Sequence, residues 1–292
     1  MKKHLLCIIL IALGLTINAQ ITYVNINATG LNNGTSWANA YTNLHSATYN
    51  TTAGEIWVAQ GTYSPTKNSV DAIPSNISQK TFRVRFNVKI YGGFVGTETS
   101  LTQRNWKNNP TILSGQLGAT TKAYNVVKFD GNSNATELDG FTVQNGQANG
   151  TTELFGGAIV MVNSSSPIIR NCIFLNNIAQ QHGGAIHVSG GAPKFENCEF
   201  KNNHTNLYDG GAMYVNGATS TTIVNCLFNG NIAARHGGTM VLINTTTSNV
   251  WNCTFVNNQR GSGGIGGAIL LSATVGKKKK KIDNCIFYNN LP

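Results

Sequence analysis

A column of titratable side chains recurs in the second half of the sequence, immediately before a repeated Gly-Gly pair. The position holds His182, Asp209 and His236 in three successive repeats, each 27 residues after the last. If the repeats stack as parallel strands about 4.8 Å apart, the carboxylate would lie between the two imidazoles. Such a set could bind a transition metal or raise the pKa values of the histidines. The alternative is a polar turn edge whose neighbouring side chains hydrogen-bond to one another.

Acidic residues are too scattered to predict a calcium-dependent active site. The whole sequence holds 11 Asp and Glu residues, whereas calcium needs several oxygen ligands that converge. Glu196 and Glu199 lie close together, but the equivalent positions of the neighbouring repeats are not acidic. We therefore expect no catalytic residues and no cofactor.

Two motifs that repeat in phase define the elements that must position these side chains. The motif Asn-Cys-x-Phe-x-x-Asn occurs five times, with its cysteine repeating at steps of 26, 28, 27 and 32 residues. A Gly-Gly motif, first seen as Gly156–Ile159, keeps pace at steps of 27, 27, 27 and 29 residues. Two motifs in phase over five copies indicate a solenoid with one coil about every 27 residues.

The spacing within each motif indicates where the chain bends. Cys172 and Phe174 are two residues apart and share one face of a strand, but the apolar Ile169 lies at an odd spacing from both. All three can point inward only if the chain turns between them, and Asn is the non-glycine residue that best tolerates a left-handed backbone. We expect the corner asparagines to form a column that exchanges side-chain hydrogen bonds. They are Asn171, Asn197, Asn225, Asn252 and Asn284.

The cysteines stack in a column of their own. Five cysteines follow residues 1–19. An odd number does not suit a closed set of disulfides in an exported protein. They are expected to act as small buried apolar residues, with a redox or metal role as the alternative. The expected column is Cys172, Cys198, Cys226, Cys253 and Cys285.

The Gly-Gly motif adds a third strand to each coil. The predicted fold is therefore all-β: a right-handed parallel β-helix with three short strands per coil. The outward face of the third strand would carry an apolar and aromatic stripe, formed by His187, Tyr214, Val241 and Leu270. If it faces solvent, this stripe is a candidate contact surface for a glycan or a protein. A loop or a further domain could equally cover it.

The chain divides into three parts. Residues 1–19 read as a signal peptide, with Lys2 and Lys3 ahead of an apolar run. Residues 20–120 are expected to form an amino-terminal cap and the first decorated coils, with a helix from a Ser36 cap to about Tyr49. Residues 121–292 are regular repeats that stop directly after a motif, so we expect a truncated carboxyl-terminal end. A missing anchoring or sorting domain would follow it.

The net charge of +10 does not indicate a nucleic-acid partner. Five of the 21 basic residues form the single run Lys277–Lys281, and two lie in the predicted signal peptide. The remaining body is close to neutral, with no broad basic face. No transmembrane segment is predicted in the mature chain.

The repeats resemble known families. Phe-x-x-Asn, as in Phe174–Asn177, paired with Gly-Gly-Ala-Ile is similar to the repeat of the chlamydial polymorphic outer-membrane proteins. The amino-terminal part, with Ile56–Tyr63 and Tyr91–Phe94, resembles right-handed β-helix surface proteins of the Bacteroidetes, which are similar to pectate-lyase-like solenoids. The first resemblance implies an outer-membrane adhesin. The second implies a large secreted or cell-surface protein, often with a type IX sorting domain.

The functional expectation follows from these patterns. We expect a secreted or outer-membrane surface β-helix that contacts a polysaccharide or a host or cell-surface protein without catalysis. One alternative is a polysaccharide lyase or hydrolase of the pectate-lyase-like class. Another is a structural spacer that carries a missing carboxyl-terminal domain.

Overall fold

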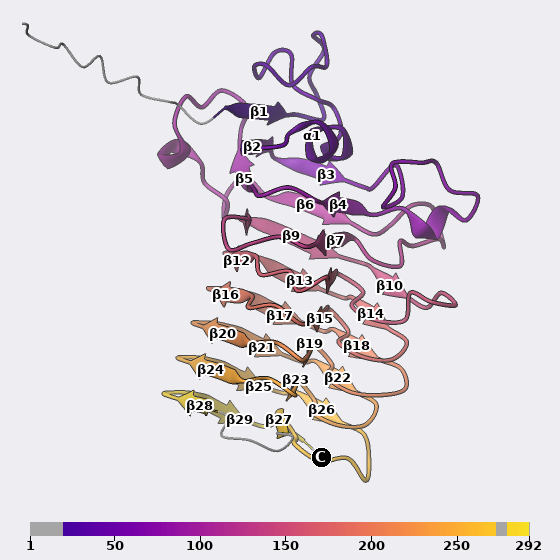
Figure 1. Ribbon diagram of the computed structural model, residues 1–292, viewed down its shortest axis with the longest axis vertical. Helices are drawn as coiled ribbons and strands as arrows, with labels where there is room; N and C mark the ends of the chain where they lie inside the picture. Colours follow the sequence, from indigo (N-terminus) through magenta and orange to yellow (C-terminus); the bar gives the residue numbers. More distant parts are fainter. Residues whose placement is uncertain (1–19, 273–278, 292) are drawn as a thin grey trace, which may run out of the picture.

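Strands of the chain stack coil upon coil along one axis, and each pairs in parallel with the equivalent strand of the next coil (Figure 1). The computed structural model describes residues 20–272 and 279–291. Over these residues the fold is an all-β parallel solenoid of about nine turns with very little helix. The predicted β-helix is therefore confirmed. The predicted signal peptide lies outside the described residues.

Three long sheets run the length of the described solenoid and form its walls. Sheet A comprises β1 (Ile21–Val24), β2 (Gly54–Ala59), β5 (Val88–Phe94), β8 (Glu137–Asp139), β12 (Ile168–Arg170), β16 (Lys194–Glu196), β20 (Ser220–Val224), β24 (Thr247–Trp251) and β28 (Lys279–Asp283). Sheet B comprises β3 (Gly61–Tyr63), β6 (Thr111–Ser114), β9 (Phe141–Gln144), β13 (Ile173–Leu175), β17 (Glu199–Lys201), β21 (Leu227–Asn229), β25 (Thr254–Val256) and β29 (Ile286–Tyr288). Sheet C comprises β4 (Phe82–Val84), β7 (Val127–Asp130), β11 (Ile159–Val162), β15 (Ile186–Ser189), β19 (Met213–Asn216), β23 (Met240–Ile243) and β27 (Ile269–Ser272).

A fourth sheet adds one very short strand to the regular coils. Sheet D comprises β10 (Gln147–Ala148), β14 (Ile178–Ala179), β18 (His204–Thr205), β22 (Ile232–Ala233) and β26 (Gln259–Arg260). Each of these strands has two residues, which is too short for an alternating pattern to be recognised in a sequence. The coil therefore has one more side than the three strands expected.

The corner between sheets A and B is made by the asparagine before each cysteine. Asn171, Asn197, Asn225, Asn252 and Asn284 have φ between 49° and 55°, in the left-handed region. The turn directs both neighbouring strands inward, so that Ile169, Cys172 and Phe174 are all fully buried. The odd spacing in the sequence is thus resolved by a single left-handed residue per coil.

The phenylalanines of the cysteine motif form one stacked column, in which the first four rings are buried and the last is exposed. Phe174, Phe200, Phe228, Phe255 and Phe287 occupy equivalent register positions in sheet B. Their successive ring centroids are 4.6–4.8 Å apart, and the rings are nearly parallel. This separation equals the spacing of paired strands, so each ring covers the next.

A second internal column consists of the asparagine that ends each cysteine motif. Asn177, Asn203, Asn231 and Asn258 are fully buried. The amide of Asn203 donates to Oδ1 of Asn231 at 2.9 Å and to the carbonyl of Phe174 at 3.0 Å. The same pair of bonds recurs in the neighbouring coils. Buried polar groups in this column are therefore paired from coil to coil, as burial requires.

The amino-terminal helix is shorter than the sequence predicts. Helix α1 spans Leu44–Asn50, and Asn43 caps it by accepting a hydrogen bond from the Ser46 N–H. The predicted start at Ser36 is wrong because residues 36–39 form bends and a turn, and Tyr41 then pairs with Val24 in a β-bridge before the helix begins. Leu44 and Ala47 are buried, and α1 packs against β1 and β4 as expected of a cap. Two single-turn 3-10 helices, η1 (Ile77–Gln79) and η2 (Leu101–Gln103), lie in connecting loops.

The corner geometry makes a stability prediction at Asn225, which is exposed. Asn225→Val should lower the free energy of unfolding by about 1–2 kcal/mol, because a β-branched residue is disfavoured in the left-handed region. Asn225→Gly should stay within about 0.5 kcal/mol of the parent, because glycine adopts this conformation without strain. Urea unfolding followed by circular dichroism measures both. Equal effects of the two substitutions would contradict a left-handed corner.

Candidate functional site

His182, Asp209 and His236, which precede the Gly-Gly pairs, are neighbours. The side chain of Arg235 also lies among them and pairs with Asp209. Nδ1 of His182 lies 3.5 Å from Oδ2 of Asp209. The guanidinium of Arg235 binds both oxygens of Asp209, through Nε at 2.9 Å and Nη2 at 2.9 Å. His236 donates its backbone N–H to Asp209, while its ring Nδ1 accepts from the N–H of Ile265 at 3.0 Å. Burial raises the pKa of Asp209, but Arg235 outweighs this and leaves that pKa below its ordinary value.

These contacts do not support the metal interpretation. Both carboxylate oxygens of Asp209 and one ring nitrogen of His236 are already engaged. In the part of the chain that the structure describes, no three His, Cys, Asp or Glu side chains converge as metal ligands. Asp209 is instead paired with Arg235, and Nδ1 of His182 has no hydrogen-bond partner among the described residues.

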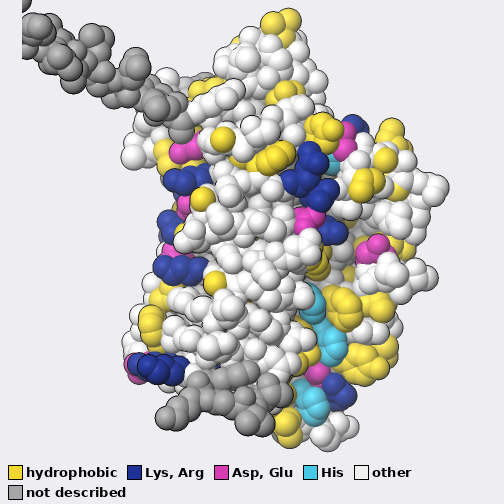
Figure 2. Space-filling model, viewed as in Figure 1, with side chains coloured by type: hydrophobic (Ala, Val, Ile, Leu, Met, Phe, Trp, Pro, Cys, Tyr) yellow, Lys and Arg dark blue, Asp and Glu magenta, His cyan; other side chains and the backbone are white. Residues whose placement is uncertain are grey.

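The predicted solvent-facing stripe on sheet C is covered, so that part of the prediction is wrong. Tyr214 is 8% exposed and Val241 is 1% exposed, while His187 and Leu270 are partly buried. The ring of His182 stacks on Tyr214 at 4.2 Å, and Phe155 stacks on His187 at 4.8 Å. Figure 2 shows histidines beside hydrophobic side chains along this edge.

The glycines of the Gly-Gly motif explain why the outer face of sheet C is covered. The first glycine of each pair has a positive φ, 64° at Gly183 and 70° at Gly210. A Cβ on Gly183 would lie 2.1 Å from the carbonyl oxygen of Ile186, so only glycine fits this reversal. The reversal turns the preceding side chain toward the equivalent strand of the next coil, where Phe155 stacks on His187 and His182 stacks on Tyr214. An imidazole or a phenyl ring therefore covers these two positions of the stripe.

The cysteines lie on successive coils with their thiols inside the solenoid. Cys172, Cys198, Cys226 and Cys253 are buried, Cys285 is partly buried, and all five are free. Burial raises the pKa of Cys172 to about 12 and also raises that of Cys226. A thiol that stays protonated is a poor nucleophile and a poor metal ligand.

The corner asparagines form an interrupted column of amides on the outside. Asn171 donates to Asp139 at 2.8 Å, Asn197 to Asn171 at 3.4 Å, and Asn284 to Asn252 at 2.7 Å. The amides face the outside of the corner between sheets A and B, where Asn197 and Asn225 are exposed.

A groove runs beside this column and was not anticipated from the sequence. A pocket of about 240 Å³ lies between the loop that joins β5 to β6 and the strands β9 and β13. It continues into a shallower hollow of about 410 Å³ along the corner. The two share Trp106, Lys107, Asn171 and Glu199, and the hollow adds Asn197, Cys198, Asn225 and Leu227.

The wall of the groove is a loop fixed by its own hydrogen bonds. Glu98 accepts the backbone N–H groups of Val95, Gly96 and Thr97 at 2.6–3.0 Å. Burial raises the pKa of Glu98, but these donors outweigh it and leave the pKa lowered. Arg104 reaches Oδ2 of Asp139 at 2.6 Å and the carbonyl of Gly92 at 3.1 Å. The loop is therefore held by its own hydrogen bonds before η2 and is tied to sheet A after η2 by Arg104.

Two glycines let this wall approach the solenoid. A Cβ on Gly93 would lie 2.5 Å from Cα of Trp106, and one on Gly140 would lie 2.9 Å from Cβ of Trp106. Gly140 has φ 83° and occupies the corner position that is asparagine in the five later coils. Glycine in place of asparagine at position 140 is the signal in the sequence that a segment packs against this corner.

The groove offers an aromatic ring, amides and one acid. The Trp106 ring is partly exposed, and Nζ of Lys107 lies 5.3 Å from its centroid. Glu199 is the acid that lines the groove, and it pairs with Lys201. Polar groups beside a partly exposed ring suit the recognition of a neutral polar ligand. They do not form the pair of carboxylates that acid–base cleavage of a glycosidic bond needs.

None of the helices in the described residues is long and apolar enough to cross a membrane.

Comparison with known proteins identifies the family of the chain. A search of the curated proteins and a search of the solved structures found no match to the chain. A family model described as the right handed beta helix region matches residues 125–291, more than half of the 292 residues. The chain therefore belongs to the right-handed β-helix family.

Proposed function

We propose that this chain is a secreted or cell-surface β-helix that binds a polysaccharide without cleaving it, in the groove between the Trp106 loop and the corner of sheets A and B. The observation that carries the proposal is the juxtaposition of a partly exposed indole with a column of corner amides. Sugars offer C–H faces to an aromatic ring and hydroxyls to amides, so both surfaces match this ligand class.

The direction of the groove favours a polymer over a single sugar. Asn171, Asn197 and Asn225 occupy equivalent positions in three successive coils. Equivalent groups in stacked strands repeat about every 4.8 Å along the axis. A chain laid along the axis would therefore meet the same kind of amide in each coil.

The absence of catalysis is part of the proposal. Glu199 is the one acid among the described residues that line the groove, and Lys201 neutralises it. Proton abstraction from a uronate, or acid–base hydrolysis, would need further charged groups or a bound calcium ion beside the scissile bond. We therefore expect retention of a polysaccharide without formation of product.

The proposal is tested by retention on immobilised polysaccharides. The parent protein should be retained by at least one neutral or weakly acidic polymer. Trp106→Ala should weaken that binding at least about ten-fold, because aromatic residues carry much of the energy of a contact surface. Trp251→Ala is the matched control, since Trp251 is exposed on sheet A, outside the groove. It should bind like the parent.

Other results of the retention experiment would favour other functions. Release of unsaturated or shortened sugars in the presence of calcium would favour a lyase or a hydrolase. Binding to a cell-surface protein in place of any polymer would favour an adhesin of another kind. Unchanged binding by Trp106→Ala would show that the groove is not the binding site. No binding to any partner would favour a structural spacer.

A further inference from the structure

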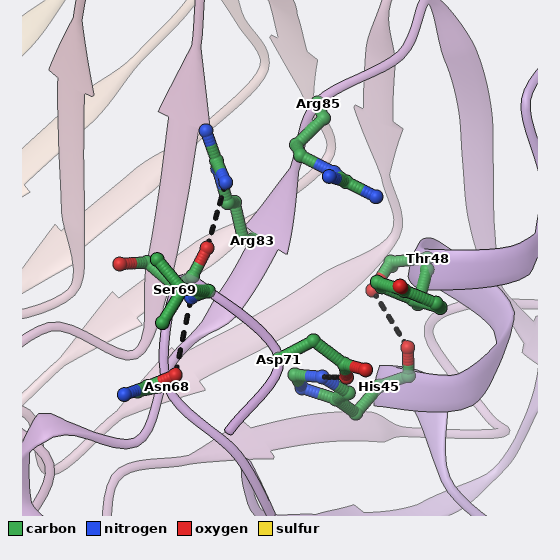
Figure 3. Close-up of a pocket in the computed structure, with 9 residues that line it drawn as sticks. His45, Thr48, Asn68, Ser69, Asp71, Arg83 and Arg85 are labelled. Carbon is green, nitrogen blue, oxygen red and sulfur yellow. Dashed lines mark hydrogen bonds and ion pairs between the residues drawn. The ribbon is translucent and has the colours of Figure 1, made fainter. Parts of the chain in front are cut away.

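A small pocket with a surplus of positive charge lies at the amino-terminal end of the solenoid, between α1, the segment around Ser69 and β4 (Figure 3). Its interior room is about 20 Å³, enough for a water-sized group and too little for a sugar ring. His45 and Thr48 of the helix form one side, and Arg83 and Arg85 form the other.

Arg85 brings a guanidinium that no described acid neutralises. The side chain is exposed at the mouth of the pocket, and its Cζ lies 5.0 Å from the ring centroid of Tyr49 and 5.2 Å from that of Phe86. This stacking holds the planar group without using its N–H donors. Five donors in a fixed fork therefore remain for a ligand.

Arg83 contributes one further donor. Its Nη1 donates to the carbonyl of Ser69 at 2.7 Å, and its Nη2 pairs with Asp130. Its Nε is buried and has no hydrogen-bond partner among the described residues. A buried N–H without a partner costs free energy that an acceptor in the pocket would recover.

The other charges of the pocket balance one another. Asp71 accepts from Nε2 of His45 at 2.8 Å and from Nζ of Lys67 at 3.0 Å. Burial lowers the pKa of His45, although Asp71 opposes the shift, so the imidazole is neutral at pH 7. Lys67 offsets Asp71, and Arg83 offsets Asp130, which leaves Arg85 as the unbalanced charge.

We propose that this pocket binds the oxygen atoms of one small oxyanion, with the Arg85 fork and the Nε–H of Arg83 as its donors. Guanidinium groups bind sulfate, phosphate and carboxylate oxygens through parallel N–H bonds. The interior has room for about one ligand oxygen, so the rest of the oxyanion would lie at the mouth beside Arg85, whether it is a free ion or a group that projects from a larger molecule. The proposal is independent of the groove, which involves other residues.

The first experiment titrates sodium sulfate into the full chain at constant ionic strength and follows the heat released. One site per chain is expected. Arg85→Met should weaken the binding at least ten-fold, and Arg85→Lys, which keeps the charge but loses the fork, should also weaken it. Lys89→Met is the matched control, because Lys89 is an exposed cation on sheet A. It should bind sulfate like the parent.

A second arm distinguishes the free ion from an anionic group on a polymer. Dextran sulfate replaces sodium sulfate, with the same variants. If only the polymer binds and only the Arg85 variants weaken it, the natural ligand is an anionic group on a larger molecule. If Arg85→Met and Lys89→Met behave alike in both arms, or if neither probe binds, the proposal is overturned. Unchanged thermal unfolding of the Arg85 variants without ligand shows that the loss is local.

Discussion

Asn203→Ala is expected to lower the free energy of unfolding by about 3–5 kcal/mol. The side chain of Asn203 accepts from the backbone N–H and the amide of Asn177, both at 3.1 Å. It donates to the carbonyl of Phe174 and to Asn231. Truncation removes four hydrogen bonds and leaves buried groups unpaired, at about 1–3 kcal/mol for each orphaned group. Urea unfolding followed by circular dichroism measures the change.

The matched control is Asn206→Ala, three residues further along the same coil. Asn206 is exposed, and its amide donates to Gln180 on the surface. Its truncation should change the free energy of unfolding by less than about 0.5 kcal/mol. If the two variants were equally stable, the buried asparagine column would not contribute to holding the coils together.

The second large effect is the pH dependence of stability at His187. Burial, with a smaller contribution from His182, lowers the pKa of His187 to about 4. Well above pH 6.5 the imidazole is neutral in both states, so it does not affect folding. As the pH falls from about 6.5 to about 4, the unfolded state takes up a proton that the folded state does not, and stability is lost. The pKa difference corresponds to at most about 3 kcal/mol, and we expect about 2 kcal/mol because the ring is partly exposed.

His187→Phe isolates this contribution. A phenyl ring can take the place of the imidazole between Phe155 and Tyr214. It also removes Nδ1, which is buried without a hydrogen-bond partner among the described residues. The variant should lose about 2 kcal/mol less stability than the parent between pH 7 and pH 4, measured by urea unfolding at several pH values. The same slope in both proteins would show that His187 titrates normally.

The regular part of the fold was predictable because its information is local and repeated. The odd spacing between Ile169 and Cys172 requires a bend, and asparagine at the bend identifies its left-handed backbone. Five copies of this pattern fix the coil length without any knowledge of distant contacts. The helix was less predictable, because the bridge between Val24 and Tyr41 overrides the local pattern that favours a start at Ser36.

The surface was much less predictable than the core. Alternation correctly places Tyr214 on the outward face of its strand, but a face that points outward is not thereby exposed. Whether His182 covers it depends on a reversal at Gly183 that brings one coil segment over another. Charge neutralisation at Asp209 likewise depends on Arg235 from the next coil. Unlike the asparagine and phenylalanine columns, these contacts differ from coil to coil and so have no periodic signature.

The groove depends on an irregular segment, which explains why repeats alone do not reveal it. Trp106 lies in a loop whose position is set by Arg104, Asp139 and the missing Cβ of Gly140. The departure of Gly140 from the asparagine pattern is visible in the sequence, but its partner is not. A search for corners that lack their expected asparagine is therefore a way to find packed loops in other solenoids of this kind.

The most direct test of polysaccharide binding in the groove is its footprint in hydrogen exchange. The exchange of the full chain is compared with and without a polymer that retains it. Bound polymer should slow exchange in residues 104–110 and in the corner segments around Asn171, Asn197 and Asn225. Exchange around His182 and Arg85 should not change. Protection confined to any other face of the solenoid would show that the polymer does not bind in the groove.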